Sequence, residues 1–153
     1  MISTIECLRT NSANPGFKQL VVQLDADLRV RDGDEHSFYA QYNKTDHIHH
    51  VVVAYENDIP VGCGAIKEYE PGTMEVKRMF VLPEKRGKGI AGIILKNLED
   101  WCRELGFKKA ILETGKMQPE AIALYQKSGY SIIANYGQYA GVDNSLCFEK
   151  QLK

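Results

Sequence analysis

The stretch that decides the fold is Glu75-Val-Lys-Arg-Met-Phe-Val-Leu-Pro-Glu-Lys-Arg-Gly-Lys-Gly-Ile-Ala91. It begins as an apolar strand that ends at Pro83, continues through a basic, glycine-containing loop, and leads into a long amphipathic helix. The glycines of the loop allow backbone N–H groups to approach a ligand closely, and the helix start adds partial positive charge. Arg86 and Lys88 add full positive charge. The pattern is typical of a site that binds a diphosphate.

The segments around this stretch alternate between strand-like and helix-like patterns. We expect strands at residues 2–8, 51–55, 59–66, 74–81, 109–114, 130–134 and 145–151, and helices at 14–31, 89–105 and 119–128, with a weakly indicated helix at 37–42. Short connections make the second, third and fourth strands antiparallel, whereas a helix joins the fourth strand to the fifth and makes that pair parallel. The sequence therefore predicts one mixed sheet with a βαβ crossover in its middle.

Composition narrows the class of protein. A chain of 153 residues with 44% hydrophobic and 25% charged residues is about one soluble domain. The formal net charge of −1 provides no overall attraction to nucleic acid or to an anionic membrane. The N-terminus lacks the pattern of a secretory signal, and no apolar run is long enough to span a membrane. We therefore expect a cytoplasmic protein with neither nucleic-acid nor membrane partners.

The four cysteines give no sign of a metal or redox site. They stand at positions 7, 63, 102 and 147, widely spaced and without a CxxC pair. Buried thiols in a reducing compartment are the expected outcome.

The glycine-rich loop has more than one interpretation. Residues 87–92 satisfy the pattern GxGxxG, and Glu113 follows about twenty residues later, as in a dinucleotide-binding fingerprint. A dinucleotide-binding fold usually opens with that unit and repeats it, whereas here the unit follows antiparallel strands and only about sixty residues remain. A glycine-rich turn without any ligand is the remaining alternative.

Residues 75–134 resemble the GNAT superfamily of acyl-CoA-dependent N-acetyltransferases. The run Arg86-Gly-Lys-Gly-Ile-Ala91 matches the pyrophosphate loop (Q/R)xxGx(G/A) of that family, and the strand before it matches as well. Residues 105–107, 112–114 and 121–130 match the later family motifs in order and spacing. One departure is Gln118, where many members carry Asn.

The resemblance implies both a fold and a function. The fold is α/β (α+β), with a single mixed, mostly antiparallel seven-stranded sheet, a central parallel βαβ pair and helices on both faces, in one domain over residues 1–153. The function is transfer of an acetyl group from the cosubstrate acetyl-CoA to a primary amine of a small molecule or peptide, by direct attack in a ternary complex without a metal. Relatives are often dimers, so analogy alone suggests a homodimer, and the sequence itself does not indicate an oligomeric state. The alternative is a non-catalytic acyl-CoA-binding sensor or interaction module.

The same resemblance implies a set of cofactor contacts. Backbone N–H groups of the loop would hold the pyrophosphate, main-chain groups of Met79 and Val81 would pair with the pantetheine arm, and an N–H near Phe80 would polarise the thioester carbonyl. The predicted cofactor-binding residues are Met79, Phe80, Val81, Arg86, Gly87, Lys88, Gly89, Ile90, Ala91, Gln118 and Ala121.

Two side chains are candidates for acid–base chemistry. An alkylamine is almost fully protonated at neutral pH, so a base must take its proton before attack. Glu75, on the strand that ends at the loop, is the candidate base, and a solvated strand carboxylate is the alternative. Tyr125 matches the family tyrosine that approaches the cofactor sulfur, where a phenol can donate to the departing thiolate. Its alternative role is a core-edge tyrosine on the apolar face of a helix.

Other polar residues are weaker candidates for the acceptor site. Lys77 and Arg78 flank the proposed reaction centre, but strand alternation predicts opposite faces for them, so at most one would contact an acceptor. Tyr136 and Tyr139, in the loop before the last strand, would line an acceptor pocket or pack over the sheet edge, and the sequence leaves both open.

Two short polar clusters complete the candidates. The acidic run Asp32, Asp34 and Glu35 would attract a cationic amine or simply be solvated. His47, His49 and His50 resemble a metal cluster, but alternation along a strand separates His50 from the other two, and no further ligand is evident, so we expect no zinc site.

Overall fold

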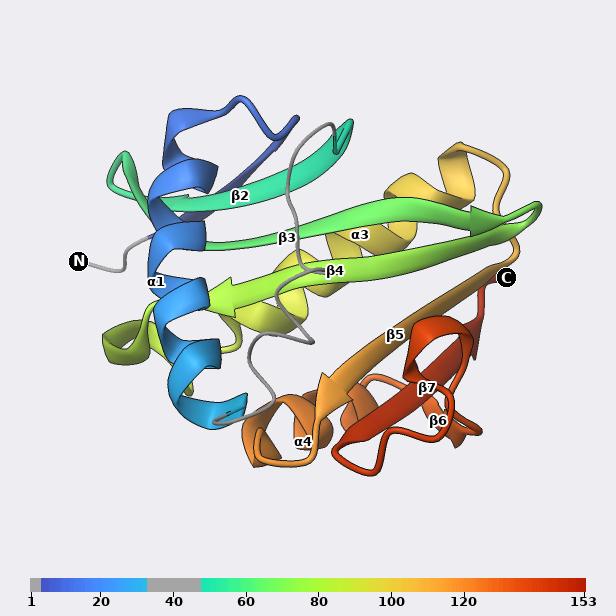
Figure 1. Cartoon of the computed structure of the whole chain (residues 1–153). Helices are drawn as coiled ribbons and strands as arrows, with labels where there is room; N and C mark the ends of the chain where they lie inside the picture. Colours follow the sequence, from blue (N-terminus) through green and yellow to red (C-terminus); the bar gives the residue numbers. More distant parts are fainter. Residues whose placement is uncertain (1–3, 33–47) are drawn as a thin grey trace.

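The computed structural model describes residues 4–32 and 48–153 and contains one mixed sheet with the strand order β1-β2-β3-β4-β5-β7-β6 (Figure 1). The strands are β1 (Ile5–Thr10), β2 (His50–Glu56), β3 (Ile59–Glu70), β4 (Thr73–Val81), β5 (Lys109–Gly115), β6 (Ser131–Ile133) and β7 (Ser145–Gln151). The helices are α1 (Pro15–Asp32), α3 (Ile90–Glu104) and α4 (Pro119–Lys127), with short 3-10 turns η2 (Pro83–Lys85) and η3 (Gly137–Tyr139).

This architecture confirms the predicted fold class. β4 and β5 are parallel, and the remaining neighbours in the sheet are antiparallel. β1 runs to Thr10 rather than to residue 8, because its ladder with β2 pairs Arg9 with Val52 and Thr10 with Val51. The helix predicted at 37–42 lies outside the described residues, and no helix among the described ranges is long and apolar enough to cross a bilayer.

Helices cover both faces of the sheet (Figure 1). On one face, a buried stripe of α1 packs against the middle strands. The helix contributes Phe17, Leu20, Val21 and Leu24 to this cluster, and the strands contribute Val51, Val53, Cys63, Ala65 and Phe80. On the other face, α3 and α4 pack over a larger core, with members that include Val52, Ile66, Val76, Ile94, Leu98, Leu112, Tyr125 and Phe148. Successive residues of β2 alternate between these two clusters, as a strand buried on both faces requires.

The parallel pair separates after a short paired segment. β4 and β5 are paired only from Thr73↔Lys109 to Glu75↔Ile111. Beyond Glu75, β4 stays bonded to β3 as far as Val81, and β5 stays bonded to β7 as far as Gly115. The two strands therefore diverge toward their C-terminal ends (Figure 1), and we call the space between residues 76–81 and residues 112–115 the β4–β5 opening.

A bulge in β4 changes which side chains face α1. Ala65 pairs with Lys77 and Cys63 with Phe80, so β4 has one extra residue between these pairs, and Arg78 adopts a left-handed φ of 59°. Lys77 and Phe80 share the face of Ala65 and Cys63, which pack against α1, and Arg78 forms an ion pair with Asp25 of α1. The predicted opposite placement of Lys77 and Arg78 is therefore wrong, because the bulge interrupts the alternation.

Candidate active site

A cavity of about 400 Å³ occupies the β4–β5 opening. Residues of α1 line it on one side of the sheet, and residues of α4 and the first turn of α3 line it on the other. All the predicted site residues except Lys88, which is exposed, line this cavity: Glu75, Met79, Phe80, Val81, Arg86, Gly87, Gly89, Ile90, Ala91, Gln118, Ala121 and Tyr125. Residues far apart in the sequence thus meet around one space that passes through the sheet.

The glycine-rich loop forms part of the cavity wall. Gly87 and Gly89 have left-handed φ angles of 80° and 82°, and a Cβ at either position would meet no atom within 4 Å. Gly89 is the N-cap of α3, and the N–H of Ile93 makes a 3.1 Å bond to the Gly89 carbonyl. The N–H groups of residues 90–92 precede this bond and have no acceptor within the helix. The loop therefore presents main-chain donors at a helix start beside the cavity.

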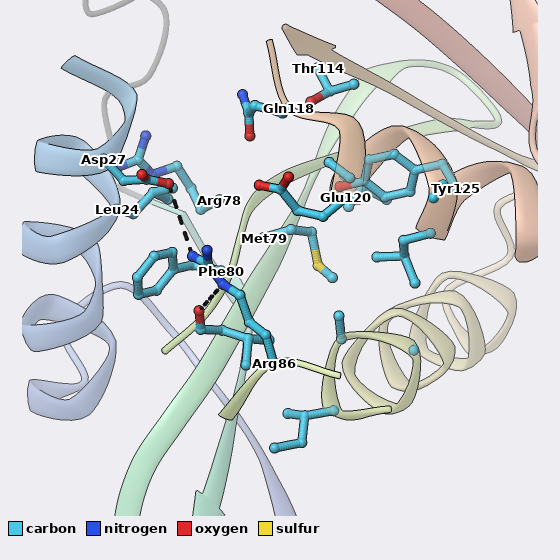
Figure 2. A pocket seen from close by; sticks show the side chains of 18 of the residues that line it. Leu24, Asp27, Arg78, Met79, Phe80, Arg86, Thr114, Gln118, Glu120 and Tyr125 are labelled. Carbon is cyan, nitrogen blue, oxygen red and sulfur yellow. Dashed lines mark hydrogen bonds and ion pairs between the residues drawn. The ribbon is translucent and has the colours of Figure 1, made fainter. Parts of the chain in front are cut away.

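Arg86 uses its backbone N–H and its guanidinium within the loop, although the sequence predicts that both bind a diphosphate. Its backbone N–H bonds to the Pro83 carbonyl at 3.3 Å, and its Nε donates to the Val81 carbonyl at 2.9 Å. Its guanidinium also lies over the Phe80 ring and 4.0 Å from Asp27 (Figure 2). The Arg86 side chain thus joins the end of β4 to the loop.

Glu75 lies where β4 and β5 begin to separate. The residue is only 8% exposed, so it is not the solvated carboxylate that one interpretation of the sequence allowed. Its Oε2 accepts a 2.7 Å hydrogen bond from the Tyr136 hydroxyl, and its Oε1 lies 3.7 Å from Lys77 Nζ. The carboxylate is held in one orientation beside the cavity, as a base that acts on a bound molecule requires.

The loop between β6 and β7 supplies this tyrosine. The side-chain amide of Asn135 donates to the carbonyls of Val142 and Ser145 at 2.9 and 3.1 Å and so fixes both ends of the loop. Tyr136 reaches Glu75, and the buried Tyr139 lines the cavity with its ring edge-to-face against Tyr136. Tyr139 thus lines the cavity, whereas Tyr136 is not among the lining residues and contacts the site through Glu75.

Glu113 is a second carboxylate on the cavity wall. It lies near the end of β5, at the position that a dinucleotide fingerprint would assign to a ribose contact. Its Oε2 accepts a 2.7 Å hydrogen bond from the Ser145 hydroxyl of the neighbouring strand. This bond joins Glu113 to β7 at the last residue pair of the β5–β7 ladder.

Tyr125 lies on the α4 side of the cavity (Figure 2). Its ring packs against Tyr130 and Phe148 with centroid separations of 5.9 and 5.8 Å, so it is a core residue as well as a wall of the cavity. Burial raises the pKa of the Tyr125 phenol well above its usual value near 10, with a smaller contribution from the charge of Glu113. The hydroxyl is therefore a neutral donor at physiological pH.

An ionic network that local patterns did not reveal connects α1 to α4. Arg31 Nε lies 3.2 Å from Asp27 Oδ1 on the same helix, and the Arg31 guanidinium forms an ion pair with Glu120 in the first turn of α4. Asp27 and Glu120 both line the cavity. The i,i+4 spacing of Asp27 and Arg31 is visible in the sequence, but their partner on α4 is not.

Two of the remaining polar candidates, His49 and His50, do not line the cavity. His47, Asp34 and Glu35 and the side chain of Asp32 lie outside the described residues, His49 is exposed, and His50 packs edge-on against Trp101. Over residues 4–32 and 48–153, no three His, Cys, Asp or Glu side chains are grouped to hold a metal.

The cysteine thiols are protonated at neutral pH. Burial raises the pKa of Cys63 and of Cys102 to about 12 and that of Cys147 to about 11, and it also raises the pKa of Cys7. A thiol in this state is a poor nucleophile. The buried cysteines therefore do not favour an acyl-enzyme mechanism.

Comparison with known proteins places the chain among acetyltransferases. Residues 18–130 match the model of the Acetyltransferase (GNAT) family. The chain is 43% identical over 102 residues to the IAA acetyltransferase of Azospirillum brasilense, which covers 66% of this chain and 67% of the relative. A crystal structure of a proposed acyl-CoA N-acyltransferase from Klebsiella pneumoniae superposes with a TM-score of 0.80 at 29% identity and covers 99% of both chains.

A more distant structure shares the fold. A GNAT family acetyltransferase from Elizabethkingia anophelis, solved with acetyl-CoA bound, superposes with a TM-score of 0.70 at 20% identity and covers 97% of this chain and 98% of that one.

The buried tyrosines predict a loss of stability at alkaline pH. Burial raises the pKa of Tyr125, Tyr130, Tyr136 and Tyr139 above the ordinary value of 10.0. Above pH 10 the unfolded chain releases these protons, whereas the folded chain retains them. Each tyrosine therefore lowers the free energy of unfolding by about 1.4 kcal/mol for every pH unit above 10. Below pH 10 its contribution to the free energy of unfolding is constant. Urea unfolding between about pH 8 and 11 measures this slope.

Tyr136→Phe provides the control for this measurement. The variant should make the alkaline slope shallower by about 1.4 kcal/mol per pH unit. A slope identical to that of the unmodified chain would contradict the raised pKa of Tyr136.

Proposed function

Because the chain belongs to the GNAT acetyltransferase family and is an acyltransferase, we propose that it transfers an acetyl group from acetyl-CoA to a primary amine of a small molecule or peptide, by direct attack in a ternary complex. The observation that supports this function most strongly is the cavity in the β4–β5 opening. It has the glycine-rich loop at one end of β4 and the buried carboxylate of Glu75 toward the other. A diphosphate-bearing donor and an amine would thus meet along one strand.

The unpaired edge of β4 suits the pantetheine arm of coenzyme A. Beyond Glu75 this edge no longer pairs with β5, although its other edge is bonded to β3. Buried main-chain groups require partners, and an arm that carries amide groups would supply them for residues such as Met79 and Val81. The donors at Gly87 to Ala91 would hold the diphosphate. The acetyl-CoA in the structural relative from Elizabethkingia anophelis supports this assignment by analogy.

Two glycines of equal conformation provide a matched test of the cofactor site. Gly89 and Gly72 have φ angles of 82° and 81°, and a Cβ at either position would meet no atom within 4 Å, but only Gly89 lines the cavity. Gly89→Ala should weaken acetyl-CoA binding at least about tenfold, because the Cβ obstructs a charge-assisted main-chain hydrogen bond that contributes about 1.5–3 kcal/mol.

The measurement is calorimetric titration of each folded variant with acetyl-CoA. Gly72→Ala carries the same backbone strain in the turn between β3 and β4 and should bind with unchanged affinity. Equal affinities in the two variants would place the cofactor elsewhere, and no binding by the unmodified protein would overturn the proposed function.

Glu75 would act as the base, directly or through water. Each turnover converts an ammonium group to an amide, so the amine loses two protons: one is released to solvent through the base, and the other ends on the thiol of coenzyme A as the C–S bond breaks. The buried, oriented carboxylate of Glu75 suits the first task. Glu113 is the competing carboxylate because it lines the same cavity.

Substitution of each carboxylate by its amide distinguishes the two. Glu75→Gln should lower kcat by about 10²- to 10⁴-fold, as expected for loss of general-base catalysis, with little change in the Kd of acetyl-CoA. Thiol release over a panel of amines measures kcat. If Glu75→Gln has the same kcat as the unmodified protein throughout about pH 6 to 9, Glu75 is not the base. If a comparable loss of kcat is found only in Glu113→Gln, the role belongs to Glu113.

Tyr125 would donate a hydrogen bond to the departing sulfur. Its raised pKa keeps the phenol protonated, and full transfer of its proton to a thiolate, whose conjugate acid has a pKa near 8.5, would be unfavourable. Stabilisation of the developing negative charge by a fixed donor is the role that this chemistry permits.

Removal of the hydroxyl tests this role. Tyr125→Phe should lower kcat roughly 10²-fold, the usual effect of losing one donor to developing charge, while the fold is retained. Tyr130→Phe is the matched control, because its ring packs against Tyr125 but its hydroxyl donates to Glu99 and it does not line the cavity. Full activity of Tyr125→Phe would exclude the assignment.

A further inference from the structure

One charged group on the cavity wall has no role in the acetyl transfer proposed above: the guanidinium of Arg78. Its Nε is the one buried side-chain nitrogen or oxygen, among the residues that the structure describes, without a hydrogen-bond partner. The side chain is only 2% exposed. A buried N–H without an acceptor costs about 1–3 kcal/mol, and more when the group is charged. The site is thus built with a donor whose acceptor a ligand can provide.

The fold positions this donor at some energetic cost. The bulge in β4 holds Arg78 in the left-handed region, a conformation that costs a residue other than glycine about 1–2 kcal/mol. The carbonyl of Arg78 accepts a 3.4 Å hydrogen bond from the Cys63 thiol of β3, which holds the bulge against its neighbour. The side chain consequently extends from β4 toward α1 on the side of Leu24 and Asp27 (Figure 2).

Asp25 neutralises only part of this arginine. Arg78 Nη2 lies 2.5 Å from Asp25 Oδ1, but the Asp25 side chain is 52% exposed and shares its charge with water. Guanidinium groups present several N–H donors in a rigid plane, and Asp25 is paired with Nη2, so the Nε–H is left to donate to a second carboxylate. A charge-assisted hydrogen bond from Nε to a carboxylate is stronger than one between neutral groups.

The adjacent residue adds a second cation on the same face. Lys77 is largely buried, lines the cavity, and lies 3.7 Å from Glu75 Oε1. The carboxylates of Asp25 and Glu75 partly balance the positive charges of Arg78 and Lys77. The positive charge that remains suits a monoanion better than a doubly charged phosphate. The apolar side chains of Leu24, Leu28 and Phe80 surround this part of the cavity and exclude water from such a pairing.

We propose that Arg78, with Lys77 beside it, binds a carboxylate on the acceptor, so that the acceptors of this enzyme are amines that also carry a carboxylate, such as amino acids. The proposal rests on the acetyl transfer proposed above, because it assumes that the amine of the acceptor reaches Glu75. Arg78 then determines specificity: it selects the acceptor by the group that does not react. A site that holds a charged donor for a substrate group rejects analogues that lack the group.

Matched acceptors test this selectivity. Thiol release is compared between glycine, β-alanine, 4-aminobutyrate, leucine and phenylalanine and the amide of each, which preserves size and removes the negative charge. We expect kcat/KM for at least one amino acid to exceed that of its amide by about tenfold or more. Turnover of the amides at rates equal to or above those of every amino acid overturns the proposal and leaves the acetyltransferase function intact.

Variants separate recognition from a structural role of Arg78. Arg78→Gln should lower kcat/KM for the preferred amino acid about tenfold or more, with its amide changed by less than about twofold and the Kd of acetyl-CoA unchanged. Asp25→Asn breaks the same ion pair but leaves the Arg78 donor in place, so it should preserve the preference for the acid. If both variants lose kcat/KM equally for the amino acid and for its amide, Arg78 only anchors α1.

A direct measurement distinguishes failure of the proposal from failure of the enzyme assignment. In ¹⁵N-labelled protein, the Nε–H resonance of Arg78 is identified by its disappearance in Arg78→Gln. Titration with the amino acids should shift this resonance, and titration with the amides should not. A shift without thiol release from any amine would support the carboxylate subsite and overturn the transferase mechanism. Thiol release without a shift would support the transferase mechanism and overturn the carboxylate subsite.

Discussion

Buried main-chain groups must find partners, and β4 satisfies this requirement along its full length on only one of its two edges. Its pairing with β5 stops at Glu75, yet neither strand leaves the sheet, because β3 holds β4 and β7 holds β5. The unpaired edges face each other across the cavity. Every property proposed for the site follows from this divergence, since a continuous sheet would leave no space between the strands.

The bulge at Arg78 gives the two halves of the cavity different chemistry. Without it, Lys77 and Arg78 would point to opposite faces, and the α1 side would carry one cation rather than two. With it, Phe80 and both cations lie on the α1 side, while Met79 turns toward α3, where a Cβ at Gly64 would lie 2.5 Å from the Met79 sulfur. The α1 side of the cavity therefore carries both cations of β4, and the absence of a side chain at Gly64 makes room for Met79 beneath α3.

Several long-range contacts hold the reactive groups in place. Tyr136, on the loop between β6 and β7, donates to Glu75 on β4, and Ser145 donates to Glu113 on β5. Arg31 connects the end of α1 to the start of α4 on the other side of the opening. The two strands that diverge are thus linked again by side chains from elements outside the pair, so the width of the cavity depends on the tertiary structure as a whole.

The sequence by itself determined the order of the elements, the parallel crossover, the glycine-rich loop and the candidacy of Glu75 and Tyr125. The first three rest on periodicity, turn residues and motif spacing, which are properties of neighbouring residues, and the two candidate side chains rest on the resemblance to the GNAT superfamily. Only the tertiary structure decided that β4 and β5 separate, that Arg78 forms a bulge, that Arg86 uses its own donors within the loop, and that Tyr136 reaches Glu75. The point at which two strands stop pairing, and the position of a bulge, depend on how strands distant in the chain pair with each other. The hydrogen bond between Tyr136 and Glu75 joins residues 61 positions apart and leaves no local pattern in the sequence.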